Sequence, residues 1–266
     1  MKTIPSKRLL SLVIPSYKDE KIIVPHIKKL IAVLDTIRFD YEIIVVIDGI
    51  FDKSFELLKK AKFRKTTVLA YPNNQGKSFA LRLGTRFAEG DYVMFLDCGD
   101  EIDPSGISML LEHIEWYEAD IVVGSKRHPA SIVNYSLLRR ILSEGYYFGV
   151  RLLFGVQVKD TQAGIKVFRR DVVRKIFPLL VEKRFTGDLE ILVVAQRHGF
   201  KKIFEAPIKL NYDFEGISSA ANVRTIWGMI IDTLAIFYRD KILNYYSKSV
   251  AGTRIPSNMK TIIGKN

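Results

Sequence analysis

Acidic side chains follow three short apolar segments in the first half of the chain, at residues 9–14, 41–47 and 92–96. The acids are Asp19 and Glu20, Asp48 and Asp52, and Asp97, Asp100 and Glu101. Helix capping explains Asp52 at least as well as chemistry does, because aspartate is favoured at helix N-termini. Asp97, Asp100 and Glu101 repel one another unless a cation joins them, and their oxygens suit Mg²⁺ or Mn²⁺. These three residues therefore predict a metal site that bridges to the phosphates of a nucleotide.

A second candidate is the turn Gly76-Lys77-Ser78, which precedes a helical pattern. The phosphate-loop motif GxxxxGK[ST] requires glycine where this chain has Tyr71, so that motif is excluded. A glycine turn, a lysine and a helix N-terminus together still favour an anion. On these residues alone, a plain loop-to-helix junction is an equally good interpretation.

The elements that must position these residues alternate between two periodicities. Continuous apolar runs that suit strands buried on both faces lie at 9–14, 41–47, 66–70, 92–96 and 120–123. Helical patterns separate them, at 54–61, 78–88 and 105–117 and after Pro25, where Ile27, Leu30, Ile31 and Leu34 share one face. The alternation predicts an α/β fold with a doubly wound, mostly parallel sheet, whose ligands bind beyond the carboxyl ends of the strands.

The second half of the chain is less regular. We expect helices at 134–156, 187–197 and 222–246, and strands at 163–169, 201–205 and 208–212, the last two flanking Pro207. The tail after Ser247 is polar, and we expect it to be loose. The predicted organisation is a catalytic domain at 1–221, an amphipathic C-terminal helix at 222–246 and a polar tail at 247–266.

Composition narrows the class of protein. The chain has 266 residues, 48% of them hydrophobic, which excludes a disordered chain, and its single cysteine excludes a disulfide scaffold. The net charge of +12 favours polyanionic partners: nucleic acid, anionic lipid or phosphorylated substrates. Nucleic acid is the weakest of these, because no stacking platform or recognition motif accompanies the charge.

Longer runs resemble a known family. VIPSYKDE, EIIVVIDGIFDKS and NNQGKSFALRLGTRFAEGDYVMFLDCGD are similar to the nucleotide-sugar half of family-two glycosyltransferases of the GT-A fold. GSKRHP, LLRRILSEGYYFGVRLLFGVQVKDTQAGIKVFRRD and FTGDLEILVVAQRHGFKKIFEAPI narrow the resemblance to polyprenyl-phosphate hexose synthases, which include the dolichyl-phosphate glucosyl- and mannosyltransferases. The likeness extends from about residue 9 to about residue 246.

The resemblance implies a role for each matching position. The nucleotide pocket would contain Pro15, Tyr17 and Glu20, with Asp48 facing the base and Gly76 and Lys77 beside them. Asp97 would begin the family's DxD metal motif and act in catalysis with Asp188. Arg127, Arg139 and Ser143 match positions that hold the acceptor phosphate, and Asp188 and Glu190 match positions near the sugar.

The chain departs from the family pattern at Gly99, which stands where the second acid of DxD belongs. Either Asp100 or Glu101 then replaces that acid, or Asp97 makes a single carboxylate contact. Asp188 is a candidate for sugar-hydroxyl contact or for an auxiliary base, and helix capping explains it equally well.

The resemblance implies an inverting, metal-dependent transfer of a hexose from a UDP- or GDP-sugar to a polyprenyl phosphate. A phosphomonoester is largely dianionic at neutral pH and needs positive holders more than a base, which suits the arginine forks of Arg127 and Arg139. For Arg140 a solvated basic face is as good an interpretation. The alternatives are transfer to a sugar hydroxyl of a lipid-linked or cell-surface glycan and non-catalytic binding of a nucleotide sugar.

A polyprenyl acceptor stays in lipid, so we expect the protein at a membrane surface. Two segments suit interfacial helices: one has Tyr146, Tyr147, Phe148, Leu152, Leu153 and Phe154 with Arg151, the other Ile226, Trp227, Ile230, Ile231, Leu234 and Phe237 with Arg224 and Arg239. No run reaches the ~20 apolar residues that a spanning helix needs. We therefore expect a peripheral protein on the cytoplasmic face of a membrane.

Overall fold

The structure is a computed structural model. It describes residues 8–99, 101–131, 137–183, 186–211, 223–247 and 254–263, with only the backbone for residues 137–142, 223–226 and 263. Asp100 lies outside the described residues, as do the side chains of Arg139, Arg140, Arg224 and Ile226.

In the described part of the chain, one sheet of eight strands forms the centre of the fold, in the order β7-β5-β6-β4-β1-β2-β3-β8. The strands are β1 (Leu9–Ser16), β2 (Asp40–Asp48), β3 (Thr66–Tyr71), β4 (Tyr92–Leu96), β5 (Ile121–Ser125), β6 (Ile165–Arg169), β7 (Ile203–Pro207) and β8 (Lys260–Ile263). Neighbouring strands pair in parallel except where β6 meets β4 and β5 and where β8 meets β3. The predicted doubly wound, mostly parallel sheet is confirmed.

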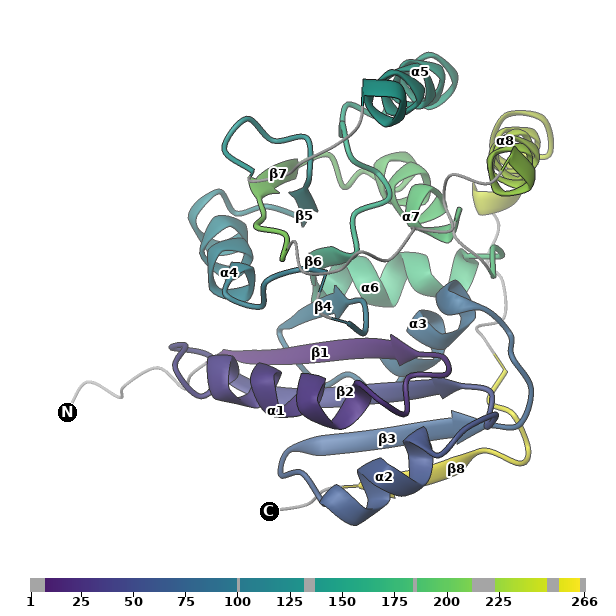
Figure 1. The fold of residues 1–266 in the computed structure, drawn as a ribbon. Helices are drawn as coiled ribbons and strands as arrows, with labels where there is room; N and C mark the ends of the chain where they lie inside the picture. The colour runs from purple at the N-terminus through teal and green to yellow at the C-terminus, as the bar shows by residue number, and fades with distance from the viewer. Residues whose placement is uncertain are drawn as a thin grey trace.

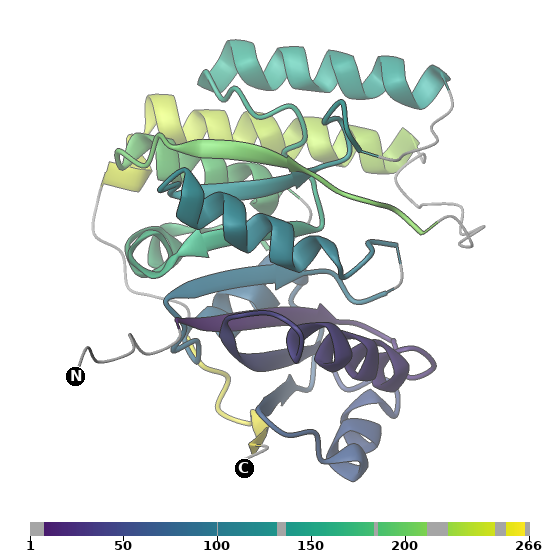
Figure 2. The ribbon, with the colours of Figure 1, turned by 90° about the vertical axis from the view of Figure 1, so that its left-hand side faces the viewer.

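Helices cover both faces of the sheet (Figures 1 and 2). They are α1 (Ile23–Leu34), α2 (Ser54–Ala61), α3 (Lys77–Thr85), α4 (Gly106–Trp116), α5 (Leu137–Phe154), α6 (Arg170–Ile176), α7 (Gly187–Arg197) and α8 (Val223–Phe237). The side chains of α1, α2 and α4 share one core with alternate residues of the strands, such as Leu10, Leu12 and Ile14 of β1. Those of α3, α6 and α7 share the other core with Val13, and α5 and α8 pack outside α7.

Helix α1 shows how the sequence pattern produces this packing. Ile23, Ile27, Leu30 and Leu34 recur at helical spacing, and all four are buried in the core beneath the sheet. Pro25 lies in the first turn, where its missing N–H costs no intrahelical hydrogen bond.

The structure corrects the sequence predictions at three places. Pro207 ends β7 in register with Ser125 instead of separating two strands, and residues 208–211 make only an isolated bridge between Leu210 and Ile102. The tail was expected to be loose, but β8 within it pairs with β3 at the end of the sheet. Helix α6 was not predicted, because seven residues are too few for a clear helical period.

Candidate active site

The predicted site residues lie along the edge of the sheet formed by the carboxyl ends of the parallel strands. β1, β2, β4 and β5 point toward this edge, and the antiparallel β6 begins there. Asp97 follows β4 directly, and Arg127 follows β5 after one residue. An ion pair of 2.6 Å between Glu101 and Lys126 connects the two segments that carry them. The metal-motif aspartate and the candidate acceptor arginine therefore lie at the same edge.

Four charged side chains meet at this edge. The Nζ atom of Lys77, the first residue of α3, lies 2.8 and 2.9 Å from the two carboxylate oxygens of Asp97 and 3.2 Å from Asp188 Oδ2. The other oxygen of Asp188 accepts a hydrogen bond of 2.6 Å from Lys166 Nζ, which also donates to the carbonyl of Ala163. Lys77, Asp97, Asp188 and Lys166, here called the charge cluster, therefore form a continuous chain of two cations and two anions.

The charge cluster runs from solvent into the core. The side chain of Asp97 is 44% exposed, whereas those of Asp188 and Lys166 are 7% and 1% exposed. Burial alone would raise the pKa of Asp188, but the ammonium groups of Lys166 and Lys77 outweigh it and hold that pKa below its usual value. Burial likewise opposes the charge of Lys77, and the two aspartates reverse this and raise its pKa. Asp188 is thus a carboxylate at neutral pH, and Lys77 is an ammonium.

Gly164 fixes the position of the Asp97 carboxylate. The backbone N–H of Asp97 donates to the Gly164 carbonyl at 2.9 Å. A Cβ atom on Gly164 would lie 2.6 Å from Asp97 Oδ2, closer than real Cβ contacts allow. The lack of a side chain at Gly164 is therefore what leaves room for the carboxylate that faces Lys77.

Adding one methyl group at this position tests the geometry. We expect Gly164→Ala to displace the Asp97 carboxylate and to lower the catalytic activity of the site by about 100-fold, since misplacing a reacting group by ~1 Å costs this much. Gly106→Ala is the matched control, because a Cβ there meets nothing within 4 Å. Steady-state kinetics of both variants measure the effect, and equal activities would contradict this role of Gly164.

The carboxylate oxygens at this edge are ligands that suit a hard divalent cation. Mg²⁺ and similar ions are often held by one or two carboxylates together with water and phosphate oxygens. Asp97 offers one half-exposed carboxylate, and Glu101, whose side chain is 60% exposed, offers another that is paired with Lys126. Within the described residues no three acidic, histidine or cysteine side chains are grouped as ligands. Substrate phosphates would therefore have to complete the coordination.

An exposed aromatic pair lies where β1 and β2 end. Tyr17 and Phe51 are 45% and 53% exposed, and their rings meet edge to face with centroids 5.9 Å apart. Lys18 Nζ lies within 6 Å of both ring centroids. The Glu20 carboxylate accepts from the Lys53 N–H at 3.2 Å, which holds the two segments together. Rings and a cation so arranged can receive the base and phosphate of a nucleotide; the nucleotide roles of Tyr17, Glu20 and Pro15 stay predictions.

Asp48 organises the turn that leads into α3. Its buried carboxylate accepts hydrogen bonds from the Tyr71 hydroxyl (2.9 Å), the Asn74 amide (2.8 Å) and the backbone N–H groups of Gln75 (2.7 Å) and Gly76 (2.9 Å). Gly76 has φ of +96°, which favours glycine. Asp48 thereby holds the turn that ends at Lys77. Its contacts are to the protein, and the predicted contact with a nucleotide base stays a prediction.

Arg127 connects the end of β5 to α5. Its guanidinium donates to the carbonyls of Ser143 (3.2 Å) and Lys159 (3.0 Å), pairs with Glu144 and lies 5.1 Å from the centroid of the Tyr147 ring. Ser143 is exposed and meets Arg127 through its carbonyl. The structure thus brings Arg127 and Ser143 together as predicted for one site, while their contact with an acceptor phosphate stays a prediction.

Glu190 is enclosed by the protein. It is fully buried, and its carboxylate accepts hydrogen bonds from the backbone N–H groups of Val181 and Glu182 and from the Tyr246 hydroxyl. Burial raises its pKa, although these donors oppose the rise. The contacts give Glu190 a structural role, joining α7 to residues 181–182 and to Tyr246. They lend no support to the predicted contact with the sugar.

The sequence of this chain matches a known protein family. Residues 11–177, more than half of the chain, match the model for "Glycosyl transferase family 2". The chain belongs to glycosyl transferase family 2. This segment of the family 2 chain contains Lys77, Asp97 and Lys166 of the charge cluster, and α7 adds Asp188 just beyond it.

Similar proteins include two dolichyl-phosphate beta-glucosyltransferases. The one from Drosophila melanogaster is 32% identical over 203 residues, which cover 70% of this chain. The one from Homo sapiens is 31% identical over 229 residues, which cover 80% of this chain and 69% of that protein. The family 2 chain spans 62% of the length of the Drosophila relative.

Solved structures show the same fold. Glucosyl-3-phosphoglycerate synthase from Mycobacterium tuberculosis in complex with UDP aligns over 91% of this chain and 81% of its own, with a TM-score of 0.65 and 16% identity. Mannosyl-3-phosphoglycerate synthase from Rubrobacter xylanophilus aligns over 88% of this chain and 75% of its own, with a TM-score of 0.66 and 14% identity. These likenesses confirm the GT-A fold.

Two side chains at this edge, Lys166 and Phe51, were not predicted from the sequence. Lys166 lies in a strand pattern, where a lysine normally faces solvent, and only its partner Asp188 explains its burial. Phe51 is a single aromatic residue after Asp48-Gly49, and its partner Tyr17 follows a different strand. A polar residue at a core-facing position of β6 was the available signal for Lys166.

Proposed function

We propose that this family 2 glycosyltransferase is a divalent-metal-dependent, inverting hexosyltransferase that acts at a membrane surface. Its donor is a nucleoside diphosphate hexose, and its acceptor is a polyprenyl phosphate. The observation that carries the proposal is the charge cluster, because two cations and two carboxylates at the carboxyl edge of the sheet support binding of a metal–diphosphate complex there. Solved neighbours with Mn²⁺ and UDP-glucose, and relatives named for dolichyl phosphate, support it.

Donor activation depends on Asp97 and Lys77. Asp97 would hold the divalent ion, with Asp100 or Glu101 as a second ligand, and the bound ion would neutralise charge on the departing diphosphate. Lys77 lies between Asp97 and Asp188, so its ammonium group is within reach of a diphosphate bound at Asp97. When the donor binds, Lys77 exchanges part of its bond to Asp97 for one to a phosphate oxygen, where its charge also stabilises the leaving group.

The state of Asp188 favours a phosphate acceptor over a hydroxyl acceptor. An efficient general base has a pKa near the working pH. Both carboxylate oxygens of Asp188 already contact ammonium groups, Lys166 Nζ at 2.6 Å and Lys77 Nζ at 3.2 Å, and these contacts oppose uptake of a proton. A hydroxyl nucleophile needs such a base, whereas a phosphomonoester is largely dianionic at neutral pH. Asp188 accordingly orients Lys77 and accepts from a sugar hydroxyl.

The acceptor phosphate is held near the ends of β5 and α5. Arg127 is fixed by two backbone carbonyls and paired with Glu144, so an incoming phosphate would replace the Glu144 carboxylate on a preset guanidinium. Ser143 lies beside it on α5, and Arg139 lies one turn earlier, in the first turn of the same helix. The guanidinium groups of Arg127 and Arg139 supply the positive charge that a dianionic phosphate requires.

An apolar surface lies on α5 and α8, which run side by side above α7 (Figures 1 and 2). Tyr146 of α5 contacts Thr233 of α8 through their hydroxyls, and the rings of Phe154 and Phe237 meet. The exposed apolar residues, here called the α5–α8 face, are Phe148, Leu152, Trp227, Ile230, Ile231 and Leu234. In the described residues, no helix is long and apolar enough to span a bilayer. The face supports peripheral attachment to the membrane that holds the acceptor.

Acidic substitutions on α8 test this attachment. We expect the double variant Trp227→Glu, Ile231→Glu to bind anionic vesicles about 100-fold more weakly, because burying each apolar side chain contributes ~1.5–3 kcal/mol. Trp116→Glu is the matched control, since Trp116 is 85% exposed and lies on α4, on the other face of the sheet. Vesicle sedimentation measures binding, and an equal loss in the Trp116 variant would contradict the proposed attachment.

The proposed reaction is tested with a panel of labelled UDP- and GDP-hexoses, each incubated with a short-chain polyprenyl phosphate. We expect label from one donor to enter the lipid fraction in the presence of Mg²⁺ or Mn²⁺ and at least 100-fold more slowly after chelation with EDTA. Turnover that is insensitive to EDTA would contradict the metal requirement.

A further inference from the structure

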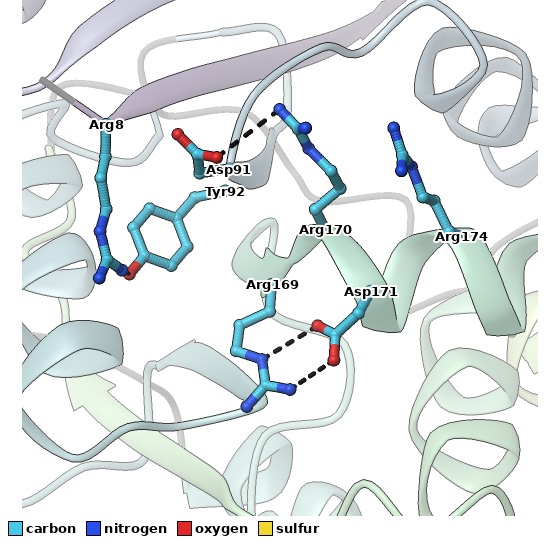
Figure 3. Close-up of a pocket in the computed structure, with 7 residues that line it drawn as sticks. All are labelled: Arg8, Asp91, Tyr92, Arg169, Arg170, Asp171 and Arg174. Atoms are coloured by element: carbon cyan, nitrogen blue, oxygen red, sulfur yellow. Dashed lines mark hydrogen bonds and ion pairs between the residues drawn. The ribbon is translucent and has the colours of Figure 1, made fainter. Parts of the chain in front are cut away.

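Two pockets rich in arginine adjoin along α6 at the amino-terminal edge of the sheet, one beside Arg8, Asp91 and Tyr92 and the other between α3 and α6; together they are called the groove. Its first chamber has a volume of about 320 Å³, and Arg8, Arg169, Arg170 and Arg174 line it. Its second chamber, of about 430 Å³, shares Arg170 and Arg174 and adds Arg82 and Arg86 of α3. Figure 3 shows Arg170 and Arg174 extending from α6 in the same direction, one helical turn apart. The volumes are typical of small-molecule sites.

The arginines of the groove differ in how their charge is balanced. Arg8 lies 3.4 Å from Glu115, Arg169 pairs with Asp171, and Arg170 lies 3.7 Å from Asp91 (Figure 3). The guanidinium of Arg174 has no ion pair or hydrogen bond to any residue that the structure describes. Arg174 therefore leaves an unbalanced positive charge at the junction of the two chambers.

The second chamber contains a buried cation with unused hydrogen-bonding capacity. Arg82 is only 8% exposed, and its Nε atom has no hydrogen-bond partner, although one Nη donates to the Leu180 carbonyl. Burial lowers the pKa of Arg82, and the carboxylates of Glu190 and Glu182 oppose this shift. No described carboxylate lines this chamber. A bound anion would balance the charge of Arg174 and lie beside the guanidinium of Arg82.

The rest of the second chamber is apolar. Val93, Val173, Phe177 and Pro178 form its wall, with Ala88 and the Thr85 side chain beside them. Arginines at one end and apolar side chains at the other suit a ligand with an anionic head and a small apolar body. Guanidinium groups match the oxygens of a phosphoryl group in particular.

The groove is separate from the charge cluster. Lys77 is the first residue of α3 and faces the carboxyl edge, whereas Arg82 and Arg86 lie in and just after the last turns of the same helix. Asp97 and Asp91 likewise lie beyond opposite ends of β4. The two sites are thus at opposite ends of shared elements, and the groove does not depend on the proposed function.

We propose that this groove is a second ligand site, which binds a phosphate monoester with its phosphoryl oxygens at Arg174, Arg170 and Arg82 and its apolar part against Val173 and Phe177. The phosphate monoester can be a soluble metabolite or the headgroup of a lipid, since both present the same oxygens.

Calorimetric titration of the full chain with inorganic phosphate and with phenyl phosphate tests this. We expect phenyl phosphate to bind about tenfold more tightly than inorganic phosphate, and Arg174→Ala to weaken phenyl phosphate binding by at least about tenfold. Lys175→Ala is the matched control, because it removes an equal charge from the next residue of α6, which does not line the groove. Asp103→Asn, a substitution at the carboxyl edge of the sheet outside the groove lining, should leave the Arg174-dependent binding unchanged.

Vesicles of phosphatidic acid, with phosphatidylcholine vesicles as reference, distinguish the lipid source. Arg174-dependent binding of phenyl phosphate supports a soluble ligand, and Arg174-dependent binding of phosphatidic acid alone supports a lipid headgroup. Arg174 is exposed, so circular dichroism should show both α6 variants folded alike. The proposal is overturned if neither probe depends on Arg174, or if Lys175→Ala weakens binding as much.

Discussion

Replacing Asp97 with asparagine should lower kcat about 1000-fold while leaving the fold intact. The substitution keeps the shape of the side chain but removes the charge that would hold the cation and oppose Lys77. Losing one group that stabilises charge in the transition state costs about 100- to 1000-fold, and the metal site would be weakened as well. Because the Asp97 side chain is 44% exposed and Lys77 retains Asp188, we expect little change in the free energy of unfolding.

Asp103→Asn is the matched control for this experiment. Asp103 lies in the same segment after β4, but its carboxylate accepts from the Ser105 N–H and faces Lys209 at 3.7 Å, away from the charge cluster. Steady-state kinetics and chemical denaturation should be measured for both variants. If Asp97→Asn kept kcat within a few-fold of the wild type, Asp97 would not be part of the metal site.

The second large effect is on stability and arises at Asp188. Replacing Asp188 with alanine leaves Lys166, whose side chain is 1% exposed, without its carboxylate partner. Breaking a buried ion pair in this way costs about 3–5 kcal/mol, because the remaining charge is uncompensated. Denaturant-induced unfolding measures this loss in the free energy of unfolding.

A double variant separates the charge from the fold. In Asp188→Leu, Lys166→Met both charges are replaced by apolar groups, and such replacements are often neutral or stabilising. We expect this double variant to regain most of the unfolding free energy that Asp188→Ala loses. We expect it to have no transferase activity. If Asp188→Ala alone were as stable as the wild type, the buried pair would not support the site.

The same pair predicts a dependence on pH. Lys166 and Lys77 outweigh burial and hold the pKa of Asp188 below the unfolded value of ~3.9. A depressed pKa stabilises the folded state fully above the unfolded pKa, and this stabilisation is lost as the pH falls below it. The difference in unfolding free energy between the wild type and Asp188→Asn should therefore be largest near neutral pH and shrink as the pH falls below about 4.

The sequence predicted which acidic residues lie at the carboxyl edge of the sheet, because the apolar runs that form the strands are visible in the local sequence. Asp97 and Asp48 directly follow or end buried apolar runs, and the parallel sheet brings such positions to one edge. The elements that were missed depend on contacts distant in sequence. β8 is the segment Lys-Thr-Ile-Ile, whose β-branched side chains favour a strand, but four residues are too few to predict that it pairs with β3.

Partners within the site were equally beyond local patterns. The guanidinium of Arg127 was recognisable as a phosphate fork, but its pairing with Glu144 and the Lys159 carbonyl requires α5 and residue 159 to fold back over β5. Glu190 shows the converse: its match to the family pattern predicted contact with the sugar, yet residues 181–182 and Tyr246 fold onto it and donate hydrogen bonds to its carboxylate. The sequence therefore predicted which side chains could do chemistry, but it did not predict the residues that pair with them in the fold.

The choice of acceptor tests most directly whether the charge cluster supports hexose transfer to a phosphate group. A labelled donor hexose should be offered to equal amounts of a polyprenyl phosphate and the corresponding polyprenol, with Mn²⁺, and the lipid products treated with mild acid. We expect label only on the phosphate, released by acid as free sugar, and none with Asp97→Asn. Acid-stable label on the polyprenol would contradict transfer to the phosphate group.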